Sequence, residues 1–144
     1  MTSDQMNTLL RDELSAVETY QQALGKAEDR LGHESESEQL AAILTDHQRA
    51  AARLETLIRK AGGTPTQESG AWGAWSNIVM GTAKLFGEKS ALKALKEGEE
   101  SGLKEYQDIL QDPAIRGELK TEINAFAANQ IAHIRTLDDL MARF

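Results

Sequence analysis

Residues 6–24 read MNTLLRDELSAVETYQQAL, and apolar side chains recur in this stretch at alternating spacings of four and three residues. The positions selected by this spacing are Met6, Leu10, Glu13, Val17, Tyr20 and Leu24. Such a heptad pattern predicts a long helix that packs nearly parallel or antiparallel to other helices. Glu13 is the exception, because a carboxylate occupies a position where the pattern calls for an apolar side chain.

The same pattern returns 86 residues later, where residues 92–110 read LKALKEGEESGLKEYQDIL. Glu99 and Tyr106 are then the equivalents of Glu13 and Tyr20. The offset also relates His47 to His133, and each histidine follows its glutamate by 34 residues. The chain is therefore interpreted as one helical hairpin used twice, with a Glu and a His from each copy directed inward.

Four long helices are expected, covering residues 3–31, 35–61, 90–110 and 113–144. Thr2 and Gln5 form a capping box for the first helix, and Gly32 ends that helix. Gly62 and Gly63 end the second helix. Asp112 is expected as the N-cap of the last helix, with Pro113 at its first position.

The resulting architecture is a single all-α domain over residues 1–144, with one hairpin at 1–61, a crossover at 62–90 and a second hairpin at 91–144. Within the crossover, the apolar pattern from Trp72 to Phe86 predicts a short fifth helix that packs over the bundle. A crossover of this length lets the second and third helices run parallel, which is the ferritin-like arrangement of a four-helix bundle.

The amino-acid composition excludes several kinds of site and binding partner. The chain lacks cysteine, which excludes disulfides, thiolate metal ligands and a cysteine nucleophile. Its formal net charge of −7 argues against binding to nucleic acid phosphates. No stretch approaches the ~20 apolar residues of a membrane span, and no signal peptide is recognised, so a cytoplasmic protein is expected.

The inward-facing polar residues predict a metal site. Burying a charge costs several kcal/mol unless the charge is paired, so charged residues are normally absent from such positions. Carboxylate and imidazole groups are the usual ligands of Fe, Mn and Zn. The sequence therefore predicts one divalent metal ion, Fe, Mn or Zn, in the bundle core, with the candidate ligands Glu13, His47, Glu99 and His133. Tyr20 and Tyr106 could hydrogen-bond to these ligands.

Two sets of residues resemble known families. The segments Glu13-x-x-Ala16-x-x-x-Tyr20 and Glu99-x-x-Gly102-x-x-x-Tyr106 resemble rubrerythrin-type members of the ferritin-like superfamily. The Gly62-Gly63-Thr64-Pro65 segment and the Gly98-Glu99 pair are similar to those of an uncharacterised bacterial family of ferritin-like four-helix bundles of unknown function. The resemblance implies a metal centre in the bundle and a link to oxidative or metal stress.

The chain departs from the rubrerythrin pattern at two positions. That pattern has a Glu-x-x-His pair on the second and fourth helices, and the glutamates of these pairs bridge two metals. Here Leu44 precedes His47 and Gln130 precedes His133. The resemblance therefore implies one metal ion in place of two, with Gln130 as a supporting residue.

Other interpretations remain open. A chain that binds no metal is an equal alternative. The Glu and His residues would then form buried hydrogen-bonded pairs that set helix register in a non-enzymatic structural or protein-interaction bundle that has lost the di-iron site. No catalytic residue is assigned, and enzymatic activity is left undecided. Self-association of the bundle is another open alternative, and no particular protein partner is indicated. Counting residues from the expected turn places Glu13 and His47 about 10 Å apart along the bundle, so that Tyr20 would face His47.

Overall fold

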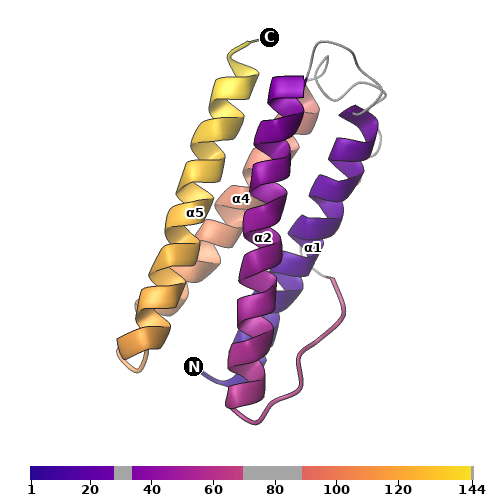
Figure 1. The fold of residues 1–144 in the computed structure, drawn as a ribbon. Helices are drawn as coiled ribbons and strands as arrows, with labels where there is room; N and C mark the ends of the chain where they lie inside the picture. The colour runs from indigo at the N-terminus through magenta and orange to yellow at the C-terminus, as the bar shows by residue number, and fades with distance from the viewer. Residues whose placement is uncertain (28–33, 70–88, 144) are drawn as a thin grey trace.

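The computed structural model describes residues 1–27, 34–69 and 89–143. These ranges hold four helices, which are α1 (Ser3–Ala27), α2 (Glu34–Lys60), α4 (Lys89–Leu110) and α5 (Gly117–Met141), and they contain no strand (Figure 1). The all-α prediction is confirmed. The predicted fifth helix at 72–86 and the predicted end of the first helix at Leu31 lie outside the described residues.

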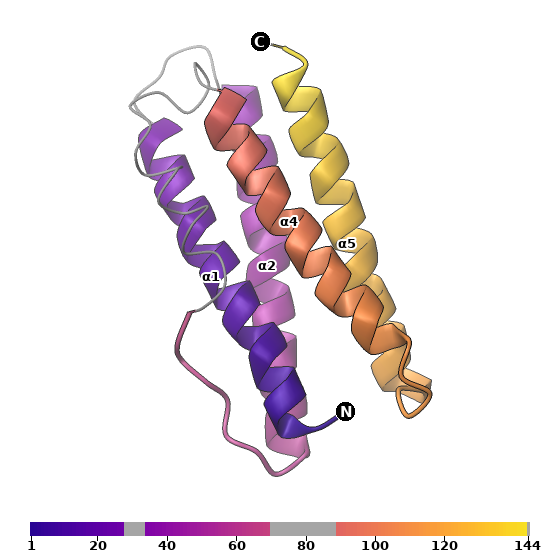
Figure 2. The ribbon, with the colours of Figure 1, turned by 180° about the vertical axis from the view of Figure 1, so that it is seen from behind.

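The helices form two hairpins packed side by side. α1 packs along α2, and α4 packs along α5, while contacts between the hairpins run from α1 to α4 and from α2 to α5. Figures 1 and 2 show that α2 and α4 run in the same direction, so α2 ends at the opposite end of the bundle from the start of α4. This arrangement brings the middle turns of all four helices to one level.

The predicted ends of the first hairpin are present. The backbone N–H of Thr2 donates to Gln5 Oε1 at 2.9 Å, and the N–H of Gln5 donates to Thr2 Oγ1 at 3.2 Å, which makes a reciprocal capping box. Gly62 has a φ of 82°, a left-handed conformation that glycine adopts without strain. The N–H of Gly63 then donates to the carbonyl of Ile58 at 2.9 Å and closes the end of α2.

The predicted start of the last helix was wrong. Asp112 and the three residues after it form a turn, in which Asp112 Oδ1 accepts from the N–H of Ala114 at 2.9 Å. α5 begins four residues later than expected, at Gly117, which has a φ of 67°. The Asp-Pro pair therefore shapes the turn, because an Asp side chain can hydrogen-bond to the backbone two residues further on.

The buried core is divided by a layer of polar residues. One apolar cluster includes Tyr20, Leu92 and Leu137, and the other includes Leu10, Leu54 and Tyr106. Within the described ranges, the buried Glu and His residues are Glu13, His47, Glu99 and His133. Since desolvated charges must be paired, the contacts within this layer decide whether the fold tolerates it.

None of the described helices combines the length and the apolar character that crossing a bilayer requires.

Candidate metal centre

The four polar residues predicted from the sequence come together in the middle of the bundle, one from each helix. Glu13 is 4% exposed, His47 2%, Glu99 0% and His133 3%. The imidazole rings of His47 and His133 have their centroids 4.9 Å apart. A buried layer of two carboxylates and two imidazoles therefore spans all four helices.

His47 lies between the two glutamates. Its Nδ1 contacts Glu13 Oε2 at 2.5 Å, and its Nε2 contacts Glu99 Oε1 at 2.7 Å. Tyr20 faces His47 as expected, since its ring stacks on the imidazole with the centroids 5.5 Å apart. The expectation that Glu13 would lie away from His47 was wrong, because Glu13 contacts the imidazole directly. Glu13 lies 14 residues before Ala27 and His47 lies 13 residues after Glu34, so the two residues are nearly level.

His133 has a carboxylate on each side as well. Its Nδ1 lies 3.3 Å from Glu99 Oε2, and its Nε2 donates to Asp46 Oδ2 at 2.8 Å. The Asp46 side chain is 36% exposed, so this end of the network lies near solvent. Asp46 was not predicted from the sequence. The repeat does not mark it, because position 132, its equivalent in the second hairpin, is an alanine.

The two tyrosines complete the network across the hairpins. The hydroxyl of Tyr20 donates to Glu99 Oε1 at 2.9 Å, and the hydroxyl of Tyr106 donates to Glu13 Oε1. Each tyrosine therefore binds the glutamate of the other hairpin. The predicted supporting role of the tyrosines has a structural basis in these contacts, because each hydroxyl orients a buried carboxylate.

Burial and charge together set the protonation of the layer. Burial of the Glu99 carboxyl raises its pKa, but His47 and His133 outweigh burial and lower the pKa to about 2. Burial lowers the pKa of His47, but the carboxylates of Glu99 and Glu13 outweigh burial, so the net pKa is raised well above 6.5. Burial, with the neighbouring carboxylates, raises the pKa of Tyr20 and of Tyr106 well above 10. Glu99 is therefore ionised, the tyrosines keep their protons, and His47 attracts a proton or another cation.

Three of the four predicted ligands form a set with the spacing of a metal site. His47, Glu99 and His133 each offer one ligand atom, and these atoms all lie within 4.8 Å of one another. The other nitrogen of each imidazole is bound to a carboxylate, Glu13 for His47 and Asp46 for His133. Proteins commonly hold metal-bound histidines in this way, because the carboxylate fixes the tautomer and the orientation of the ring. The donor set therefore fits a divalent metal ion.

Gln130 and Leu44, the two departures from the rubrerythrin pattern, have different surroundings. Gln130 is buried and donates from Nε2 to the backbone carbonyl of Glu99 at 3.4 Å. A Cβ at Gly102 would lie 2.4 Å from Gln130 Nε2, so the glycine makes room for this amide. Leu44 packs against the apolar cluster around Tyr20. Neither residue supplies the anionic oxygen that would bridge two cations.

Three comparisons relate the chain to known proteins. No curated protein matches it, and no solved structure matches it. One family model, described as a domain of unknown function (DUF2383), matches residues 1–112. The match includes Glu13, His47 and Glu99 and ends before α5, which carries His133. Because the family model matches more than half of this chain, the chain belongs to the DUF2383 family.

Proposed function

We propose that the protein binds one divalent metal ion in the core of its helical bundle. The ligands are His47 Nε2, His133 Nδ1 and the carboxylate of Glu99. Glu13 and Asp46 belong to the same site, since each binds the second nitrogen of one histidine. The observation that carries the proposal is the orientation of the two imidazole rings. One nitrogen of each ring contacts Glu13 or Asp46, and the other nitrogen contacts Glu99.

The proposed site is a mononuclear version of the ferritin-like centre. Two features support a ferritin-like fold. α2 and α4 run in the same direction, and each of the four helices contributes one Glu or His to the polar layer. A second metal would need the bridging carboxylates that Leu44 and Gln130 replace. Iron, manganese and zinc all suit a set of two imidazoles and one carboxylate.

A metal ion held here would supply Lewis-acid chemistry or, for iron and manganese, one-electron chemistry. The chain's own residues control the surroundings of that ion. Tyr20 and Tyr106 keep the two glutamates oriented, and apolar clusters pack on either side of the layer. A role in handling oxidants or metals under stress follows from the resemblance to rubrerythrin-type proteins.

Elemental analysis of the purified, untagged protein tests the proposal. The protein is incubated separately with Fe(II), Mn(II) and Zn(II), freed of unbound metal and measured for bound metal per chain. We expect about one equivalent of at least one of these metals. The double variant His47→Gln/His133→Gln should retain none, while His33→Gln, which changes the third histidine of the chain, should retain as much as the wild type. Full retention by the double variant would refute the ligand assignment.

A second candidate function is a structural or protein-binding bundle. It is favoured by the closure of the polar layer, in which the imidazoles, carboxylates and tyrosine hydroxyls hydrogen-bond to one another. A closed layer fixes the register of four helices, which is an established use of buried polar groups. Under this function the double histidine variant would lose stability, and wild-type protein would retain no metal in the assay above.

A further inference from the structure

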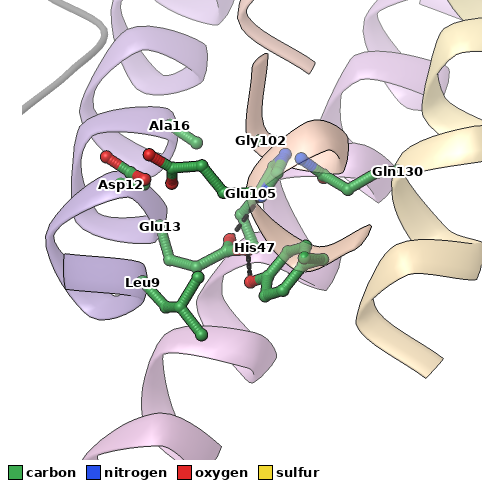
Figure 3. A pocket seen from close by; sticks show the side chains of 9 residues that line it. Leu9, Asp12, Glu13, Ala16, His47, Gly102, Glu105 and Gln130 are labelled. Atoms are coloured by element: carbon green, nitrogen blue, oxygen red, sulfur yellow. Dashed lines mark hydrogen bonds and ion pairs between the residues drawn. The ribbon is translucent and has the colours of Figure 1, made fainter. Parts of the chain in front are cut away.

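A small cavity lies against the metal centre on the side of α1 and α4. It is lined by Glu13, His47 and Tyr106 of the polar layer, and also by Leu9, Asp12, Ala16, Gly102, Glu105 and Gln130 (Figure 3). The volume open to the centre of a water-sized molecule is about 10 Å³. That is room for about one water molecule or one small cation. The walls carry carboxylates and an imidazole, so the cavity suits a cation.

An open groove lies along the outside of the same two helices. It has a volume of about 220 Å³ and is lined by Gln5, Thr8, Leu9, Glu105, Asp108 and Ile109. Two residues, Leu9 and Glu105, line both the groove and the internal cavity. The groove and the cavity are therefore separated by these two side chains, one from α1 and one from α4.

Glu105 is a partly buried glutamate of α4 that lines both the groove and the cavity. Its Oε2 atom is buried and has no hydrogen-bond partner among the described residues. In Figure 3 the side chain extends from α4 toward α1. A buried carboxylate oxygen without a donor is costly, and a cation is the partner that would compensate it. The equivalent residue of the first hairpin is Thr19, whose hydroxyl donates to the carbonyl of Ser15 at 2.8 Å.

We propose that divalent cations reach the centre between α1 and α4, and that Glu105 transfers them from the outer groove to the cavity beside Glu13 and His47. The proposal rests on the proposed metal-binding function. Small residues at the crossing, Ala16 and Gly102, leave the cavity open next to the layer. Leu9, which is 2% exposed, forms the apolar half of the barrier. Glu105 is thus a residue that governs the rate of metal entry and is not a ligand in the loaded state.

The test measures the rate of metal loading separately from the amount bound. Metal-free protein is mixed with Co(II) in a stopped-flow instrument, and the visible absorption of protein-bound Co(II) is followed to its end point. Glu105→Gln should slow loading by about tenfold and leave the final stoichiometry unchanged, because charged walls raise the local cation concentration at an entrance. Leu9→Ala should have the opposite effect and speed loading, because it widens the barrier.

Glu100→Gln is the matched control, since Glu100 is an exposed glutamate of α4 that lines neither the groove nor the cavity. It should load at the wild-type rate. Equal loading rates for wild type, Glu105→Gln and Leu9→Ala, with normal stoichiometry, would overturn the route and leave the metal centre standing. Absence of uptake of Co(II), Fe(II), Mn(II) and Zn(II) alike by the wild type would overturn the centre, and the route with it. Circular dichroism confirms that each variant is folded before its rate is interpreted.

Discussion

Tyr20 and Tyr106 occupy equivalent positions in the two hairpins, and each donates its hydroxyl hydrogen bond to the glutamate of the opposite hairpin. The acceptors are Glu99 for Tyr20 and Glu13 for Tyr106. Both phenol rings are buried, and their hydroxyls are the contacts by which α1 and α4 bond across the polar layer. The two hairpins are therefore joined by polar contacts that are specific in register, in addition to apolar packing.

Replacing either tyrosine by phenylalanine should destabilise the bundle with little change in volume. Tyr20→Phe removes a donor from the buried carboxylate of Glu99, and the expected loss in the free energy of unfolding is about 1–3 kcal/mol. Tyr106→Phe should have a similar effect through Glu13. Urea unfolding of the metal-free variants measures both. The double variant should deviate from additivity by about 0.5 kcal/mol or more, because both glutamates bind His47. Changes below experimental error in both single variants would contradict this account.

Asp46→Asn should weaken metal binding without removing the site. The change takes away the carboxylate that fixes the ring of His133, and loss of such a partner typically lowers metal affinity by about 10- to 100-fold. Titration against a competing chelator measures the dissociation constant. The amount of metal bound at saturation should be that of the wild type. Asp139→Asn, an exposed aspartate of α5, serves as the control. Wild-type affinity in Asp46→Asn would show that Asp46 does not hold His133 for the metal.

Stability of the metal-free protein should be greatest between about pH 4.5 and pH 6.5. The pKa of Glu99 is lowered from 4.5 to about 2, so its stabilising contribution is complete above pH 4.5 and is lost as the pH falls toward 2. The pKa of His47 is raised well above 6.5, so its contribution is complete below pH 6.5 and is lost as the pH rises through the folded-state value.

Urea unfolding at about pH 3, 5.5 and 8 follows both declines. In His47→Gln the decline on the alkaline side should shrink, because the titrating imidazole is gone. A wild-type stability that keeps rising between pH 6.5 and 8 would contradict the assigned ion pair.

Metal removal should lower the melting temperature of the loaded protein. A ligand present at about 100 times its dissociation constant stabilises the folded state by about 2.7 kcal/mol. Calorimetry before and after dialysis against EDTA measures the change, and His33→Gln should behave like the wild type. The His47→Gln/His133→Gln variant should melt at the same temperature with and without added metal. A metal-dependent shift in that variant would place the ion elsewhere in the chain.

The inward-facing residues were predictable because a polar side chain at an apolar position of a heptad pattern stands out. Glu13, His47, Glu99 and His133 were found in this way and are in contact or in one layer. Their relative level was not predictable, since it depends on where the turn between α1 and α2 falls. A shift of a few residues in that turn moves Glu13 by most of a helical turn or more relative to His47.

The residues around the layer carried weaker signals. Asp46 precedes His47 and has a partly exposed side chain, so its sequence position is that of an ordinary surface aspartate. Glu105 is one of many acidic residues on the outer faces, and only the crossing of α1 and α4 makes its carboxylate oxygen buried. Contacts between helices distant in sequence decide both environments, and a single-helix pattern does not contain them.

The contact between Asp46 and His133 makes the two halves of the polar layer unequal. A two-fold dimer of identical hairpins would present the same residue at position 46 in both partners. In this fused chain the counterpart is Ala132, so one imidazole is linked to a solvent-facing acid and the other, His47, is enclosed by Glu13 and Glu99. A single chain with two non-identical hairpins can therefore place its two histidines in unequal surroundings, one linked through Asp46 to the surface and one enclosed by glutamates.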